Sequence, residues 1–186
     1  MSNLSADGKS LKTLIATPDL PELGPTPRAG RLPRAELDQK LDRFVRETRL
    51  AARLHAPVRA AALLWHDYLD ESHTISQNLG DASGSFLHGI MHRREPDYGN
   101  ARYWFHRVGK HPCFSDIARE VTRLLETKGE KALAAGLAPG GDWDPFAFVE
   151  ACEKVADRPS SDQRVQTLKS IQEIEFDCLL AHLLAF

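Results

Sequence analysis

The spacing of apolar residues constrains the fold of this chain more than any other feature. From residue 34 onward, apolar side chains recur at the 3.6-residue period of an α-helix, as in Leu37, Leu41 and Phe44. No segment sustains the alternation of apolar and polar residues that is typical of a half-buried β-strand. The sequence therefore predicts an all-α protein, with residues 34–186 folded as one irregular bundle of seven or eight helices.

Capping residues, prolines and glycines set the expected helix boundaries. Pro57 fits the first position of the second helix, while Asp97 and Asp144 are suited to cap the fourth and seventh helices. Ser85, Ser115 and Ser161 are expected at the starts of three others. The expected helices cover residues 34–54, 57–79, 85–95 and 97–108, then one from residue 115, and further helices over 130–137, 145–156 and from residue 161.

The first 33 residues differ from the rest of the chain. They hold five of the eleven prolines and show no hydrophobic periodicity. Proline removes a hydrogen-bond donor and biases the residue before it toward extended geometry. We therefore expect residues 1–33 to form an extended or disordered lead-in that the helical domain can lose without harm.

Composition excludes several classes of protein. The formal net charge of −2 argues against a nucleic-acid-binding protein, which is usually strongly basic. No apolar run is long enough for a signal peptide or a membrane span, so we expect a cytoplasmic location. The three cysteines, Cys113, Cys152 and Cys178, are too few and too far apart for a disulfide framework. The sequence leaves a homo-oligomer open.

Histidines are concentrated in one part of the chain: six of the eight lie between Trp65 and Pro112. On the two helices expected over 57–79 and 85–95, polar residues form stripes at helical spacing. If a tight turn makes the two helices antiparallel neighbours, the stripes face each other. The first stripe contains His66, Asp70, His73 and Gln77, and the second contains His88, His92 and Glu95.

Imidazole and carboxylate groups at this spacing suit a divalent metal ion such as zinc, iron or manganese. The sequence thus predicts His66, His73, His88 and His92 as metal ligands. Asp70 or Glu95 would then orient a ligand or act as a catalytic base. The same pattern also fits two solvent-facing helix surfaces.

Arginines and aromatic residues follow the second histidine stripe. Guanidinium groups bind carboxylate or phosphate through paired hydrogen bonds, and aromatic rings offer stacking faces. We therefore expect a site for an anionic or polyhydroxy small molecule. Alternatively, Arg93 and Arg94 pair with nearby acids and the aromatic residues belong to the core. The candidate substrate-binding residues are Arg93, Arg94, Tyr98, Tyr103 and Arg107.

Two short stretches resemble known families. Residues 61–67, Ala-Ala-Leu-Leu-Trp-His-Asp, resemble the central motif of HD-domain metal phosphohydrolases, which are all-α enzymes. That family has a further histidine farther upstream than His55 lies here. Residues 97–107 and the pair His111-Pro112, within residues 85–112, resemble the second helix and terminator of a tetratricopeptide-type hairpin. This second resemblance implies a helix pair that binds peptides.

Two functions follow from these patterns. The first is a small cytoplasmic metal-dependent enzyme, of hydrolase, lyase or oxygenase type, that acts on a small molecule at the histidine-rich hairpin. The second is a non-catalytic, helical-repeat-like module that binds a protein or peptide partner through residues 97–111.

Overall fold

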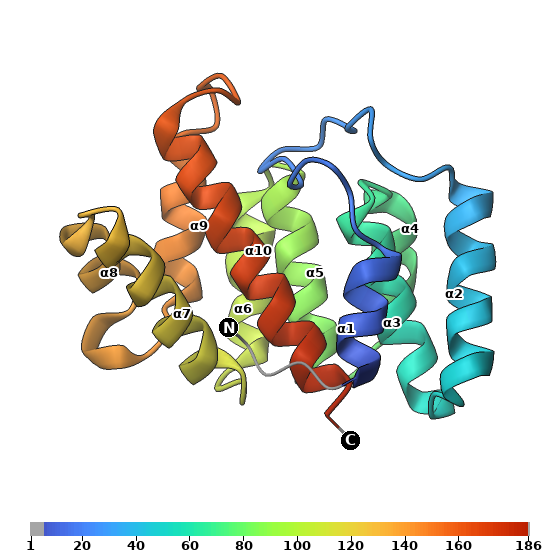
Figure 1. Cartoon of the computed structure of the whole chain (residues 1–186). Helices are drawn as coiled ribbons and strands as arrows, with labels where there is room; N and C mark the ends of the chain where they lie inside the picture. Colours follow the sequence, from blue (N-terminus) through green and yellow to red (C-terminus); the bar gives the residue numbers. More distant parts are fainter. Residues whose placement is uncertain (1–5, 186) are drawn as a thin grey trace.

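The computed structural model describes residues 6–185, and over that range the chain is helical with no β-strand (Figure 1). The described residues form ten α-helices and one short 3₁₀ turn, Pro139–Gly141. The α-helices are α1 (Ala6–Leu14), α2 (Arg34–Thr48), α3 (Ala52–Trp65), α4 (Leu69–Ser76), α5 (Ala82–Arg94), α6 (Tyr98–Val108), α7 (Phe114–Thr127), α8 (Lys131–Leu137), α9 (Pro145–Glu153) and α10 (Gln163–Leu183). The all-α fold is confirmed, but the expected seven or eight helices are too few.

Left-handed residues explain two of the extra helix ends. The helix expected over 34–54 stops at Thr48, because Arg49 takes φ 52° and its N–H donates back to the Val45 carbonyl. The helix expected over 57–79 divides into α3 and α4, because Asp67 takes φ 62°. Asp and Asn adopt this conformation more readily than most residues with a side chain.

Several predicted boundaries are confirmed and others are displaced. Asp97 caps α6 by accepting from the Asn100 N–H at 3.1 Å, and Asp144 caps α9 in the same way. By contrast, Pro57 lies inside α3 rather than at its first position. The caps of α5 and α10 are Asp81 and Asp162 instead of serines.

Helix α5 lies in the middle of the molecule, packed closely against α6 and also against α3 and α4. From Ser83 to Arg94 every residue of α5 is buried. Gly89 permits the close approach to α6, because a Cβ at this position would lie 3.0 Å from the Phe105 ring. This close packing fixes the side chains of α5 relative to those of its neighbours.

The N-terminal segment packs onto the folded body, and its first described part is the helix α1 rather than the extended or disordered chain that was expected. Leu11 and Ile15 are buried in the core, and Arg28, which belongs to the chain that links α1 to α2, is buried as well. Figure 1 shows this linking chain running across one end of the bundle before it reaches α2. Residues 1–5 of the expected lead-in lie outside the described range.

Within residues 6–185, none of the helices combines the length and apolar character needed to cross a membrane.

Candidate metal centre

Three histidines from two neighbouring helices meet at one point. His73 is on α4, while His88 and His92 are one turn apart on α5. Each offers one ring nitrogen, and the three nitrogens all lie within 4.8 Å of one another. His88 and His92 are buried and His73 is partly exposed. The short connection between α4 and α5 therefore brings together three of the four predicted ligands.

The imidazole rings pack directly against one another. The ring centroids of His88 and His92 are 4.9 Å apart and the two rings are nearly parallel. His73 meets both edge-on, at 4.6 Å from His88 and 5.3 Å from His92. Because all three are held by helices, their relative positions do not depend on a flexible loop.

The buried ring nitrogens have unmet hydrogen-bonding capacity. Neither Nδ1 nor Nε2 of His88 has a hydrogen-bond partner. Burial lowers the pKa of His88 to about 4, with further lowering by His92 and His73. Burial also lowers the pKa of His92, although Glu95 opposes the shift. These two rings are therefore neutral near pH 7, which is the protonation state that a metal ion requires of imidazole.

The carboxylate of Glu95 lies at the edge of the cluster, and its catalytic role stays a prediction. Its Oε2 is 3.2 Å from Nδ1 of His92, and Oδ2 of Asp97 is 4.0 Å from the same nitrogen. The Glu95 contact is within ion-pair distance but does not have hydrogen-bond geometry. Glu95 is partly buried, so it can reach both the ring and solvent.

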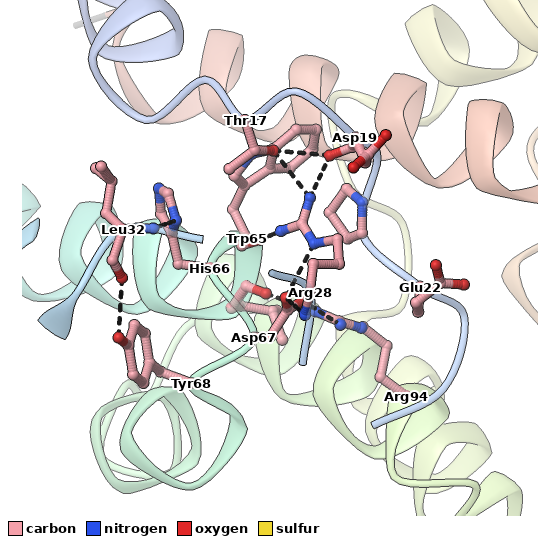
Figure 2. A network of polar contacts seen from close by, with 12 residues as sticks. Thr17, Asp19, Glu22, Arg28, Leu32, Trp65, His66, Asp67, Tyr68 and Arg94 are labelled. Carbon is pink, nitrogen blue, oxygen red and sulfur yellow. Dashed lines mark hydrogen bonds and ion pairs between the residues drawn. The ribbon is translucent and has the colours of Figure 1, made fainter. Parts of the chain in front are cut away.

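His66 does not belong to this cluster, although it was predicted as a fourth ligand. The break after Trp65 removes it from the face of α4, and its Nδ1 accepts the Leu32 N–H at 3.1 Å (Figure 2). Asp70, predicted as a catalytic carboxylate, is exposed in the first turn of α4 and is also outside the group. Both predictions assumed one continuous helix through residue 67.

Arg93 is a core residue rather than a substrate-binding one. Its guanidinium is fully buried, 2.6 Å from Oε2 of Glu175, and it lies over the Phe148 ring at 4.4 Å. Gln172 accepts a further hydrogen bond from it. All of these partners come from α9 and α10, so this arginine holds α5 to the C-terminal half of the bundle.

Arg94 is likewise occupied by the protein. It donates to the carboxylate of Asp67 at 2.6 Å and to the Leu64 carbonyl, and its side chain is fully buried. Asp67 also accepts from the backbone and side chain of Arg28, both at 2.9 Å. Figure 2 shows Arg28 and Arg94 on either side of this carboxylate, with Arg28 reaching on to Thr17. The network joins the N-terminal segment to α3 and α5, and assigning Arg94 to a substrate was wrong.

The remaining predicted residues lie on α6. Tyr98 is partly buried, whereas Tyr103 is 53% exposed and Arg107 is exposed. The Arg107 guanidinium lies 5.2 Å from the Trp104 ring, and Trp104 stacks on His88 at 3.8 Å. The Arg107 guanidinium, the Trp104 ring and the His88 ring therefore form one stack that runs from the exposed cation to the buried histidines.

Trp104 is one of the aromatic residues of the basic segment expected to offer a stacking face, but its contact with His88 was not predicted. It lies three residues before Arg107 on α6, a spacing that places two side chains on the same helix face. The sequence shows this spacing, but it does not show the register between α5 and α6 that brings Trp104 over His88.

A further buried histidine, His111, hydrogen-bonds to nearby protein groups and lies outside the cluster. Its Nδ1 accepts from the Cys113 N–H at 3.3 Å, so the proton of the neutral ring is on Nε2. Nε2 then donates to Oγ of Ser83, 3.1 Å away. With the proton on Nε2, this nitrogen donates to Ser83 rather than accepting from it, and we assign no catalysis to the pair.

Comparisons with protein-family models, with curated proteins and with solved structures gave no match, so the resemblances to HD-domain enzymes and to tetratricopeptide-type hairpins remain predictions.

Proposed function

We propose that His73, His88 and His92 bind one divalent metal ion and that the protein is a metal-dependent enzyme. The observation that carries the proposal is the buried His88 ring, which has two unpartnered nitrogens beside two other imidazoles. Buried polar groups in proteins are nearly always paired. A metal ion would take one nitrogen of each ring, whereas packing of the rings alone leaves both nitrogens of His88 without a partner.

Three imidazole ligands support chemistry at an open coordination position. Zinc bound by three protein ligands commonly holds a water molecule at the fourth position and lowers its pKa to about 7. An all-imidazole set favours zinc over manganese, although iron also accepts it. We therefore favour hydrolysis or hydration, with metal-bound water as the nucleophile, over lyase or oxygenase chemistry.

Glu95 has the position of an outer carboxylate in this proposal. Its carboxylate lies beside Nδ1 of His92 and leaves Nε2 of the same ring for the metal. A small rotation that turns this contact into a hydrogen bond would fix the ring orientation and raise ligand basicity. A carboxylate at the edge of the site can also accept a proton from bound water. Both roles use the charged form of Glu95.

The substrate we propose is a small anionic molecule. Trp104 and Arg107 extend from His88 toward the surface and offer a stacking face and an unshared cation. In the part of the chain that the structure describes, Arg93, Arg94 and Arg102 each pair with a carboxylate. Within residues 6–185, the contacts of Arg107 are instead with aromatic side chains, including the Tyr103 hydroxyl at 3.3 Å.

The cytoplasmic location is also part of the proposal. All three cysteines are free and buried, which suits a reducing compartment.

The proposal is tested with tag-free protein loaded with zinc and assayed on nitrophenyl acetate and nitrophenyl phosphate. We expect zinc-dependent hydrolysis that is lost in His88→Ala and reduced at least about tenfold in Glu95→Gln, the usual scale for general acid–base catalysis. His106→Ala, an exposed histidine on α6 outside the cluster, is the matched control. Zinc binding without hydrolysis of either ester would reject the hydrolase. Absence of zinc binding would favour the non-catalytic partner-binding module of residues 97–111.

A further inference from the structure

A cleft of about 390 Å³ lies between the N-terminal segment and the end of α9, and its lining includes none of the three histidines. One wall is formed by residues 22–28. Pro96 and Tyr98 contribute another wall, and residues after α9, among them Ala156 and Arg158, close the cleft. Its volume is within the range of small-molecule sites in proteins.

The proline-rich wall is held at both ends. At one end, the Glu22 carboxylate accepts from Lys169 and Ser160, both at 2.9 Å, and Gln172 donates to the carbonyl of Glu22 at 3.2 Å. At the other end, Arg28 is fixed by Asp67. The cleft is therefore preformed, since the segment between these anchors cannot move far from the bundle.

The lining of the cleft combines an apolar surface with a few polar groups. Leu23, Val155, Val165 and the three prolines provide the apolar part. The Arg158 guanidinium is about half exposed, and its partner Asp162 is 3.5 Å away, at the limit of a hydrogen bond. Among the described residues no hydrogen bond engages the Tyr98 hydroxyl. The Glu22 carboxylate also lines the cleft, but its charge is paired with Lys169. An arginine and a hydroxyl beside an apolar surface are then suited to a ring that carries an anionic group.

We propose that this cleft binds a small molecule with an apolar ring and a carboxylate or phosphate group, with Arg158 as the anion-binding residue. The inference is independent of the proposed metal site, because none of the residues involved contributes to the histidine cluster. It also gives the N-terminal segment a role that the sequence did not predict, as a wall of a ligand site.

The test uses metal-free full-length protein and three probes: benzoate, phenyl phosphate and neutral benzamide. Binding is measured by ligand-observed NMR and by calorimetry. We expect one of the two anions, or both, to bind at least about tenfold more tightly than benzamide, the difference of a lost charge-assisted contact. Comparison of benzoate with phenyl phosphate decides which anionic group the site prefers.

Three variants give the test its specificity. Arg158→Gln should weaken anion binding at least about tenfold, and Ala156→Phe should abolish it by filling the cleft while the melting temperature stays near that of the wild type. Arg119→Gln, which removes an exposed arginine on α7, should leave binding unchanged. Equal binding of benzamide and benzoate, full binding in Ala156→Phe, or no binding of any probe would each overturn the proposal. Retained binding in His88→Ala separates this site from the metal centre.

Discussion

Asn in place of Asp67 removes one charge from the buried network while preserving its shape. Asp67 has φ 62°, and Asn tolerates this conformation as well as Asp does. The carboxylate is fully buried and is the acid that pairs with both Arg28 and Arg94. In Asp67→Asn the two guanidinium groups would face each other without that anion. Breaking a buried ion pair costs about 3–5 kcal/mol, so we expect the free energy of unfolding to fall by that amount.

The measurement is urea denaturation followed by circular dichroism at pH 7. Asp142→Asn is the matched control, since Asp142 is exposed, and it should change stability by less than about 0.5 kcal/mol. A loss below about 1 kcal/mol in Asp67→Asn would refute the reasoning, because it is less than one buried hydrogen bond to a charged group contributes.

The free energies of unfolding of the wild type and of Asp67→Asn should depend differently on pH. Burial raises the pKa of Asp67, but Arg94 and Arg28 outweigh burial and hold the pKa below its usual value of 3.8. The unfolded chain therefore takes up this proton first as the pH falls. The stability from Asp67 is fully present above pH 3.8 and is lost as the pH falls through the lowered pKa. The difference between wild type and Asp67→Asn should shrink in that range, and a constant difference would contradict the assignment.

Three further predictions concern the core, the N-terminus and the histidines. Gly89→Ala should lower the free energy of unfolding by about 1–2 kcal/mol, because the overlap of the new methyl group with Phe105 outweighs the better helix propensity of alanine. Gly99→Ala is the control: a methyl group at that position meets no close neighbour, so the variant should be no less stable than the wild type. Deleting residues 1–30 should cost at least about 3 kcal/mol through lost apolar burial; a change within experimental error would show that the segment is dispensable after all. Because the pKa of His88 is lowered to about 4, metal-free protein should lose stability as the pH falls from 6.5 toward 4, and His88→Gln should flatten that slope.

Much of the fold could be predicted because it depends on local patterns. The 3.6-residue stripes gave the helical class, and the Asp97 and Asp144 caps are where the sequence predicted them. The convergence of His73 with the α5 histidines also followed, since a short connection between two helices leaves few arrangements.

The missed features depend on contacts between residues far apart in the chain. Arg94 pairs with Asp67 and Arg93 with Glu175, and nothing local distinguishes these buried arginines from exposed ones. Asp67, whose left-handed backbone breaks the helix and displaces His66, is also the carboxylate that pairs with Arg28 and Arg94. These partners are distant in the sequence, so the break could not be predicted from the local pattern. The packed N-terminal segment likewise depends on Arg28, whose partner is 39 residues away.

The central claim is that His73, His88 and His92 form one metal site. It is tested most directly by calorimetric titration of tag-free, chelator-treated protein with Zn²⁺, followed by elemental analysis of the dialysed product. We expect one zinc ion per chain for the wild type and for His66→Ala, and none for His88→Ala or His92→Ala. No zinc in the wild type, or a full equivalent in His88→Ala, would contradict the account.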